Sequence, residues 1–477
     1  MKKHKRPTSC EDVILASESE ARKNILKTRK IKFTSIPHDI NESIVKKELK
    51  KLSPRKLVYE LAKRKAFSIS KHYPEQIVIG SDQILVFEGK VLSKSRTIKE
   101  GINRIVEMAG KEHMLISATY TVFRSKYFWG KTKQIKVKTR NITKKEVQNY
   151  AKEYGETIKK IVGGYKIEED KLKWIQKYSG TLDDVLGFPI EGFVNKVNET
   201  KQIYVIGDPI EHSLSPEIHN FWIKENKLKA LYFRARVKRE NLVEFISETR
   251  KKKCLGVNIT IPHKERVTTL VDDFDESVRT SKAANTIYKK NNKLICTNTD
   301  GVGFVMSLLN DHKFVVAKKK VFLIGAGGAA KGITQELLKN KVDEIIVCNR
   351  NKKKAEELMK QFRQNQKNEI SIQDWCRKII PSRVNLIVNT TSVGMKKNEK
   401  LIFDLSKVEK KSTLVYDIVY NKKETFFLKD AKKKGFKTAN GLGMLVGQAA
   451  EAFKFWFGVS PTTKQIKAVN IKLRNLK

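Results

Sequence analysis

The chain has 477 residues, 40% of them hydrophobic, with a formal net charge of +46 and a pI near 9.9. It is too long for one hydrophobic core, so we expect two or three domains. Its longest apolar runs are strand-sized, well short of the roughly 18 residues of a membrane span, so we expect no membrane partner. Its basic start, residues 1–7, lacks the apolar segment of a secretory signal, and its five cysteines are scattered. We therefore expect reduced thiols and a cytoplasmic location.

The positive charge is spread along the whole chain. Lysine pairs and triples, such as Lys46-Lys47 and Lys251-Lys252-Lys253, alternate with apolar positions of helical spacing. No nucleic-acid-binding motif accompanies them, so we expect a solvated, lysine-rich surface and no nucleic-acid partner. The charge favours encounter with anionic small-molecule substrates.

The first half, residues 12–198, is predicted to be an α/β domain. A strand at Val13–Ala16 leads into the polar segment Ser17–Leu26, and a second strand, Gln76–Ile79, ends in Gly80-Ser81-Asp82-Gln83. These segments resemble the Maf family of nucleoside triphosphate pyrophosphatases. Members of that family cleave a nucleotide to its monophosphate and pyrophosphate with a divalent metal.

The resemblance implies a nucleotide site in this half. Asp82 matches the key catalytic carboxylate, and Asp82 and Glu42 are the candidate ligands of a divalent cation. The positions that match nucleotide-binding residues of the family are Ser17, Arg22, Glu42, Lys65 and Lys94.

Several positions depart from the Maf pattern. Ser19-Glu20-Ala21-Arg22 stands where the family has Ser-Pro-Arg-Arg, which removes an arginine and places a carboxylate beside the phosphates. Gln83 replaces a threonine, Ser95 replaces a proline, and residues 160–168 lack an Asp-Lys pair and a glutamine. Two interpretations stay open: a pyrophosphatase of altered or lost activity, and a catalytically idle module that steadies or dimerises the second half as a homodimer.

The second half opens with a predicted strand, Gln202–Ile206, followed by Ser213-Leu214-Ser215-Pro216. We expect Ser215 to cap a helix that has Pro216 at its first position. Two hydroxyls at i and i+2, beside the free N–H groups of a helix start, also make a pocket for a carboxylate.

Residues 321–338 have the pattern of a dinucleotide-binding strand, turn and helix. The apolar run Val321–Ile324 ends in Gly325-Ala326-Gly327-Gly328-Ala329-Ala330, and a helical pattern follows at once. Gly325 is expected to make the tight turn, and Gly327 to let the backbone approach a pyrophosphate. The helix N-terminus then presents N–H groups and partial positive charge to the phosphates.

The next strand indicates which dinucleotide is bound. An NAD site places a carboxylate at the end of this strand for the ribose diol. Here residues 344–348 end in Asn349-Arg350, followed by Asn351 and a lysine run. A guanidinium matches the oxygens of a 2′-phosphate, so the sequence predicts NADP.

Four further segments, residues 256–264, 283–286, 297–301 and 440–451, complete the pattern. In order and spacing, the second half resembles the shikimate dehydrogenase family. The resemblance implies a shikimate-binding domain over residues 201–300, completed by about 440–477, and a doubly wound Rossmann NADP domain over 301–439. It also implies reversible reduction of 3-dehydroshikimate to shikimate in aromatic amino-acid biosynthesis, with quinate as the alternative substrate.

The family's roles carry over to matching positions. Lys264 and Asp300 match the catalytic acid/base pair, and a lysine ammonium suits the step because it supplies a proton to an oxygen that gains charge. The positions that match substrate-binding residues are Ser213, Ser215, Asn258, Thr260, Asn285, Tyr420 and Gln448. The positions that match the NADP site are Gly325, Ala326, Gly327, Gly328, Ala329, Asn349, Arg350, Lys354 and Gly441, with Lys354 in place of a more usual arginine.

Overall fold

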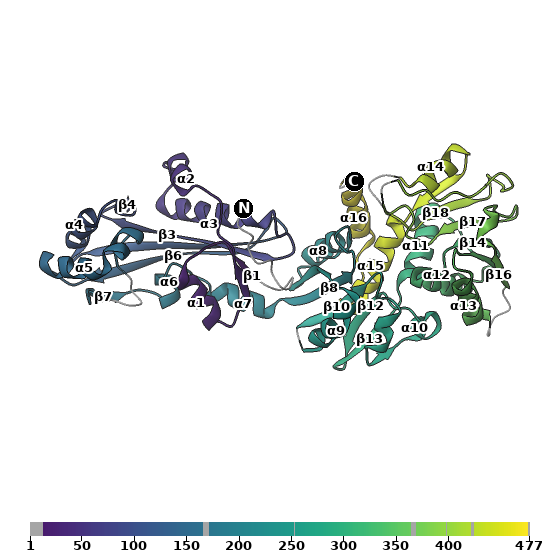
Figure 1. The fold of residues 1–477 in the computed structure, drawn as a ribbon, viewed down its shortest axis with the longest axis horizontal. Coiled ribbons are helices and arrows are strands. Elements are labelled where there is room, and N and C mark those ends of the chain that lie inside the picture. Colours follow the sequence, from purple (N-terminus) through teal and green to yellow (C-terminus); the bar gives the residue numbers. More distant parts are fainter. Residues whose placement is uncertain are drawn as a thin grey trace. The chain divides into compact units, whose positions relative to one another are not determined.

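The computed structural model describes residues 13–165, 171–251, 253–363, 369–396, 398–420 and 424–475. The basic start of the chain and part of the divergent segment 160–168 lie outside these ranges. The chain divides into two compact units, residues 1–199 and 200–477 (Figure 1). Within the described ranges, no helix has both the length and the apolar character needed to cross a membrane.

Unit 1 is built on one sheet with the strand order β2-β1-β3-β5-β6-β7, and β4 pairs with β3. β1 is parallel to β2 and β3, whereas β3, β5, β6 and β7 pair antiparallel. Its strands are β1 (Val13–Leu15), β2 (Phe33–Ser35), β3 (Ile77–Phe87), β4 (Lys90–Leu92), β5 (Glu112–Phe123), β6 (Lys126–Thr139) and β7 (Ile175–Tyr178). Its helices are α1 (Glu20–Thr28), α2 (Glu42–Glu48), α3 (Pro54–Ser70), α4 (Ile98–Met108), α5 (Lys144–Lys160), α6 (Leu182–Val185) and α7 (Glu191–Glu199).

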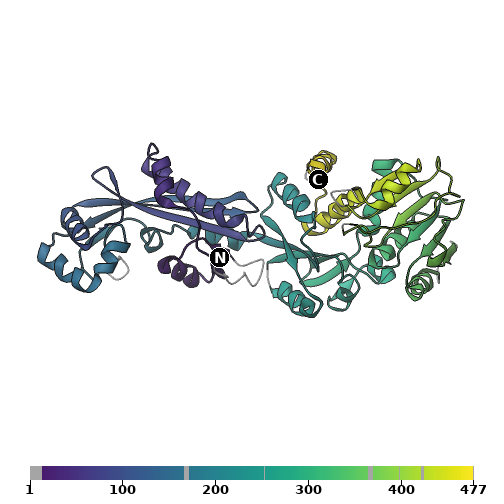
Figure 2. The same ribbon diagram turned by 45° about the horizontal axis from the view of Figure 1, so that its top comes forward.

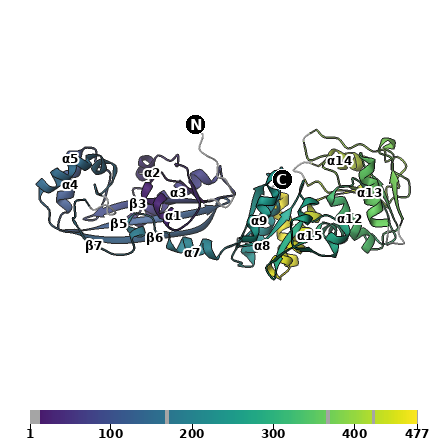
Figure 3. The same ribbon diagram turned by 60° about the horizontal axis from the view of Figure 1, so that its bottom comes forward.

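The prediction that the second strand ends at Ile79 is wrong, because β3 continues through Gly80–Gln83 to Phe87. Pairing with β5 over this whole stretch satisfies the backbone hydrogen-bonding groups. The sequence Gly-Ser-Asp by itself favours a turn and gives no sign of this pairing. Helix α3 lies on the sheet here (Figure 3), and a Cβ on Gly80 would stand only 2.1 Å from the carbonyl oxygen of Ala62. Glycine at this position therefore lets the helix backbone reach the strand.

The far end of the unit 1 sheet has its own hydrophobic core. Helices α4 and α5 pack there against β3, β5 and β6 through buried residues that include Ile105, Leu115, Ile135 and Ile158. A second core, between α3 and the centre of the sheet, contains Ile14, Val58, Ala62, Val78 and Ile116. Asp82 lies near the middle of β3.

Unit 2 contains two sheets. The first has the order β11-β13-β12-β10-β8-β9 and mixes parallel and antiparallel pairs. Its strands are β8 (Lys201–Gly207), β9 (Ala230–Arg236), β10 (Cys254–Ile259), β11 (Asp273–Phe274), β12 (Thr286–Lys290) and β13 (Lys293–Thr297), and its helices are α8 (Ser215–Glu225), α9 (Leu242–Lys251), α10 (Glu276–Ser281) and α16 (Thr463–Asn475). Ser215 is the first residue of α8 and not its N-cap, which is Leu214, so that predicted boundary was one residue off.

The second sheet of unit 2 is parallel throughout, in the order β16-β15-β14-β17-β18-β19. This is the doubly wound order of a Rossmann fold, in which the winding reverses between β14 and β17. Its strands are β14 (Lys320–Ile324), β15 (Glu344–Cys348), β16 (Glu369–Gln373), β17 (Leu386–Asn389), β18 (Leu414–Asp417) and β19 (Lys437–Asn440). The helices beside it are α11 (Asp300–His312), α12 (Gly328–Lys339), α13 (Lys352–Arg363), α14 (Phe426–Lys433) and α15 (Leu442–Phe457).

Helices cover both faces of this parallel sheet (Figure 2), which explains the unbroken apolar run in β14. Val321 and Leu323 belong to the core that includes residues of α11, α12 and α13. Phe322 and Ile324 belong to the opposite core, which includes residues of α14. Successive side chains of one strand point to opposite faces, so all four buried positions of β14, residues 321–324, must be apolar.

Helix α15 belongs to both halves of unit 2. Met444 joins the core of the parallel sheet, whereas Leu445, Ala449 and Phe453 join the core of the mixed sheet. Helix α11 packs against α15 at backbone distance, since a Cβ on Gly303 would lie 2.3 Å from the amide nitrogen of Gln448. These two helices fix the carboxyl edge of the parallel sheet relative to the mixed sheet.

Candidate active sites

The glycine turn of unit 2 follows β14 at the point where the winding of the sheet reverses. Gly325 has a φ of +114°, a conformation that L side chains rarely adopt. Its amide donates to the carbonyl of Cys348 at 2.9 Å, and a Cβ on it would meet Thr390 Oγ1 at 2.4 Å. Gly327, the N-cap of α12, has open space where a Cβ would stand. Ala326, within the turn, is buried, and Ala329 lies in the first turn of the helix.

These features fit a dinucleotide phosphate. The first N–H groups of α12 have no partner inside the helix, and the open position at Gly327 admits a ligand to them. At the end of β15, Arg350 and Lys354 are exposed, and Asn349 donates to the carbonyl of Asn351 at 2.7 Å. The exposed guanidinium and ammonium supply the charge that a 2′-phosphate requires.

Neighbouring strand ends are tied together beside this turn. Asp417, at the end of β18, accepts hydrogen bonds from Asn389 Nδ2 at 2.9 Å and Thr425 Oγ1 at 2.7 Å. Burial raises the pKa of Asp417 to about 6, against the effect of these hydrogen bonds. Gly441, the N-cap of α15, lies at the same edge, where a Cβ would come within 1.9 Å of the carbonyl oxygen of Ile418.

Lys264 and Asp300 form an ion pair between Lys264 Nζ and Asp300 Oδ2. Their side chains are only 14% and 7% exposed, respectively. Lys264 comes from the loop after β10, and Asp300 is the first residue of α11, where the helix dipole favours a carboxylate. Asn285 Nδ2 donates to the other carboxylate oxygen, Oδ1, at 2.8 Å. The pair lies beside the glycine turn, because a Cβ on Gly328 would stand 3.2 Å from Lys264 Cβ.

The amides predicted to contact the substrate ring are joined to this pair. Asn285 Nδ2 lies 3.3 Å from Gln448 Oε1, and Asn258 Nδ2 donates to the carbonyl of Asn285 at 3.2 Å. All three amides are buried. Thr260, one residue beyond β10, is partly buried, and its own amide donates to the carbonyl of Ile206 at 3.0 Å.

Hydroxyl groups gather at the start of α8. Ser213 and Ser215 are buried, and Ser215 N donates to Ser213 Oγ at 3.3 Å. Tyr232 donates its hydroxyl to Asn258 Oδ1 at 2.6 Å and also interacts with Ser215. Burial raises the pKa of Tyr420 to about 12, and the positive charge of Arg234 acts in the opposite direction.

Arg234 and Tyr232 were not among the residues predicted from the sequence. Both lie in β9, and Arg234 Nη2 donates to the carbonyl of Ser213 at 2.6 Å. The available signal was an arginine inside the run Ala-Leu-Tyr-Phe-Arg-Ala-Arg, where a charge is unusual because buried strands seldom carry one.

In unit 1, Lys65 lies between two carboxylates. Its Nζ is 2.7 Å from Asp82 Oδ1 and 2.7 Å from Glu42 Oε1, and the lysine and Asp82 side chains are 5% and 7% exposed. These residues come from α3, β3 and the first turn of α2. His38, 3.6 Å from Glu42, and then Lys65 lower the pKa of the Glu42 carboxyl. Asp82 Oδ2 is buried and has no hydrogen-bond partner among the described residues.

Ser17 and Arg22 lie beside this cluster. Arg22 Nη1 donates to the carbonyl of Ser81 at 2.8 Å and to Ser17 Oγ at 3.3 Å. Burial lowers the pKa of Arg22, whereas the charges of Asp82 and Glu42 raise it. Glu20, the carboxylate predicted beside the phosphates, is 74% exposed and pairs with Lys23 at 2.7 Å.

Two other predicted features of this site have different positions. Lys94 is exposed after β4, and within the described residues no hydrogen bond or ion pair joins it to the Asp82 cluster. Gln83 Nε2 donates to Ser117 Oγ at 3.0 Å and to the carbonyl of Val185 at 2.8 Å, so this side chain is held against α6.

A divalent cation fits the unit 1 site only with ligand oxygens from a bound nucleotide. No group of three or more His, Cys, Asp or Glu side chains in the described ranges is arranged to hold a metal. Magnesium, however, is commonly bound by one or two carboxylates together with substrate phosphates. Glu42 and Asp82 supply two carboxylates, and the unpartnered Asp82 Oδ2 is the available oxygen.

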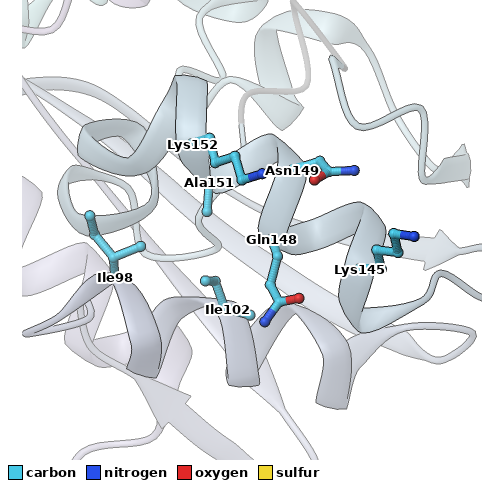
Figure 4. A pocket seen from close by; sticks show the side chains of 7 residues that line it. All are labelled: Ile98, Ile102, Lys145, Gln148, Asn149, Ala151 and Lys152. Carbon is cyan, nitrogen blue, oxygen red and sulfur yellow. The ribbon is translucent and has the colours of Figure 1, made fainter.

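A separate cavity of about 540 Å³ lies between α4 and α5 (Figure 4). None of the residues that line it belongs to the predicted nucleotide site. They are Ile98, Ile102, Lys145, Gln148, Asn149, Ala151 and Lys152.

In unit 2, the doubly wound sheet, its glycine turn and the adjoining lysine–aspartate pair define a dinucleotide-dependent dehydrogenase with a second, substrate-binding sheet. Three family models match this unit: the shikimate dehydrogenase substrate binding domain over residues 205–287, shikimate / quinate 5-dehydrogenase over 308–420, and the shikimate 5′-dehydrogenase C-terminal domain over 441–469. The chain belongs to the shikimate dehydrogenase family. In unit 1, the model for Maf-like protein matches residues 12–200, so a Maf-like domain precedes the dehydrogenase.

Individual relatives agree with this placement. The chain is 39% identical over 261 residues to shikimate dehydrogenase (NADP(+)) of Pelagibacter ubique, covering 55% of this chain and 95% of the relative. It is 41% identical over 263 residues to the enzyme of the same name from Caldicellulosiruptor bescii, covering 54% and 90%. Among solved structures, shikimate dehydrogenase from Aquifex aeolicus is similar with a TM-score of 0.51 at 34% identity, covering 57% of this chain and 97% of that one. A shikimate dehydrogenase solved in complex with NADP+ is similar with a TM-score of 0.51 at 35% identity, covering 58% and 96%.

Proposed function

We propose that unit 2 catalyses the reversible, NADP-dependent reduction of 3-dehydroshikimate to shikimate. The observation that carries the proposal is the Lys264–Asp300 pair, which lies against the glycine turn at the switch point of the sheet. The names of the relatives, which specify both shikimate and NADP(+), support it. We assign substrate binding to residues 201–300 and about 440–477, and NADP binding to residues 301–439.

Bound NADPH supplies the hydride. As the substrate carbonyl is reduced, its oxygen gains negative charge and requires a proton donor within hydrogen-bond reach. Lys264 Nζ donates that proton, and in the reverse direction it accepts the proton from the alcohol. Asp300 orients the ammonium group and balances its charge, and Asn285 holds Asp300 through the 2.8 Å hydrogen bond to Oδ1.

Substrate orientation is assigned to the groups around this pair. Ser213, Ser215 and Tyr420 hold the carboxylate. The ring hydroxyls are bound by the amides of Asn258, Asn285 and Gln448 and by Thr260. Because the three amides are joined through Asn285, ring binding and the orientation of Asp300 depend on the same side chain.

The test is a side-by-side measurement of kcat/KM for shikimate and quinate, each with NADP+ and NAD+. We expect shikimate with NADP+ to be the preferred combination. A preference for quinate would select the alternative substrate, and oxidation of neither compound would overturn the proposal.

For unit 1 we propose nucleoside triphosphate pyrophosphatase activity dependent on Asp82. It is supported by the Maf-like match and by Asp82 Oδ2, which has no hydrogen-bond partner among the described residues. In this assignment Ser17, Arg22 and Lys65 contact the triphosphate, while Asp82 and Glu42 hold a divalent cation. Lys94 is assigned a triphosphate contact from the family pattern alone.

The experiment is pyrophosphate release by the full-length chain from a panel of standard and modified nucleotides, with magnesium or manganese. Turnover by the wild type that is lost in Asp82→Ala would establish the activity. Glu88→Ala is the control, because Glu88 pairs with Lys111 on the surface at 2.9 Å. Absence of turnover with every nucleotide and metal would favour the idle structural or dimerising module.

A further inference from the structure

Arg234 places a guanidinium among the hydroxyl groups at the start of α8. It lies in β9, two residues beyond Tyr232, so the two side chains leave the same face of the strand. The hydrogen bond from Nη2 to the carbonyl of Ser213 places the guanidinium beside the Ser213-Leu214-Ser215 segment.

The electrostatic environment indicates the same position. The charge of Arg234 lowers the pKa of the hydroxyls of both Tyr232 and Tyr420, against the effect of burial. Tyr232 interacts with Ser215, and Tyr420 is the third hydroxyl assigned to the carboxylate. The hydrogen bond to Ser213 and the effect on both tyrosines place Arg234 close to this set of hydroxyls.

Neutral hydroxyls donate hydrogen bonds to a carboxylate but do not neutralise its charge. A guanidinium does both, because it carries a full positive charge and five N–H donors in a planar fork that matches two carboxylate oxygens. The bond from Nη2 to the carbonyl of Ser213 fixes the orientation of the fork beside the Ser213-Leu214-Ser215 segment.

We propose that Arg234 binds the substrate carboxylate and thereby selects an anionic substrate over its neutral counterpart. The inference rests on the proposed dehydrogenase function and adds to it a charged, specificity-determining residue. Because Arg234 contacts the end of the substrate that does not react, it contributes to binding and leaves the hydride and proton steps to Lys264 and Asp300.

The test compares shikimate with its neutral methyl ester as substrates of the full-length protein. For the wild type, kcat/KM should be much higher for the acid. Arg234→Gln should raise KM for shikimate on the order of 10- to 100-fold, with kcat changed by less than about 3-fold, since a charge-assisted bidentate contact is lost. KM for the ester should change by less than about 3-fold, and Arg234→Lys should recover part of the affinity for the acid.

Arg236→Gln is the matched control on the same strand. Arg236 is 58% exposed and pairs with Asp208 at 2.6 Å, so its removal should leave the ratio between acid and ester unchanged.

Equal losses for acid and ester in Arg234→Gln would assign Arg234 a structural role and overturn the inference. If Arg234→Gln fails to fold, the acid-to-ester ratio of Arg234→Lys decides: a ratio equal to that of the wild type also overturns it. If the wild type oxidises neither compound, the proposed function fails, whereas activity on the acid with an unchanged ratio in the variants contradicts only the role of Arg234.

Discussion

Replacing Lys264 with methionine tests what the Lys264–Asp300 ion pair contributes to the stability of the fold and, separately, to turnover. The substitution keeps the length of the side chain but removes its charge and its proton. Asp300, whose side chain is 7% exposed, would then lose its cationic partner but keep the hydrogen bond from Asn285. Breaking a buried pair costs about 3–5 kcal/mol. Asn285 and the N-terminus of α11 continue to stabilise the carboxylate, so we expect about 3 kcal/mol.

The same substitution should also abolish most of the turnover, even in protein that stays folded. A missing acid/base group lowers turnover on the order of 10²- to 10⁴-fold. The assay is NADPH consumption with saturating 3-dehydroshikimate, beside urea unfolding of the same protein. Adding Asp300→Asn to Lys264→Met should recover most of the stability, since no unpaired charge stays buried, and none of the turnover.

Lys320→Met is the control for removing a paired lysine. Lys320 lies at the opposite end of β14 from the glycine turn and pairs with Glu344 at 3.0 Å, with 39% of its side chain exposed. We expect a change of at most about 1 kcal/mol and unaltered turnover. Wild-type turnover in Lys264→Met would remove this residue from the mechanism. Unchanged stability in the same variant would refute the reasoning about the buried carboxylate.

Three other predictions follow from features of unit 2 and from the charge of the chain. Arg350→Asp should weaken NADP binding strongly and NAD binding little, because only NADP loses a charged partner; equal losses, or a similar effect of Arg363→Asp at the far end of α13, would contradict the assignment. The pKa of Asp417 is raised in the folded state from 3.8 to about 6. The free energy of unfolding therefore falls as pH rises from about 4 to about 6, by about 3 kcal/mol in total, and stays at the lower value above that. Asp417→Asn removes the charge, so its unfolding free energy relative to wild type should be higher at pH 8 than at pH 4, and a pH-independent difference in urea unfolding would refute this. Any binding of duplex DNA should be weak and fall steeply with added salt, and tight, sequence-dependent binding near physiological salt would revive a nucleic-acid partner.

The parts of the fold that were predictable are those in which the signal is local. An apolar strand, a glycine turn and a helix are adjacent in sequence at residues 321–338, so β14 and α12 were expected in order and at nearly the observed bounds. The course of β3 was not predictable in this way. Gly80 and Ser81 are common turn residues, and only pairing with β5 and contact with α3 keep them in the strand.

The candidate sites show the same division. The motifs identified Lys264 and Asp300, and the fold brings them together from separate elements. Arg234 could not be identified, because its relevance depends on β9 lying beside the loop after β8, a non-local contact. Glu20, by contrast, pairs locally with Lys23, three residues further along α1.

The contact between α11 and α15 has a consequence for how this enzyme can change. Gly303 lets the backbone of α15 approach at the residue that carries the Gln448 side chain, and Gly447 in turn lies against Gly303, with a Cβ on it 2.9 Å from the Gly303 carbonyl oxygen. A single methyl group at either glycine would displace the amide assigned to the ring hydroxyls, together with the start of α11 and Asp300. Two residues to which no substrate contact is assigned therefore constrain how the pocket can adapt to a new ring substituent. A directed-evolution library limited to pocket-lining positions would leave this constraint in place.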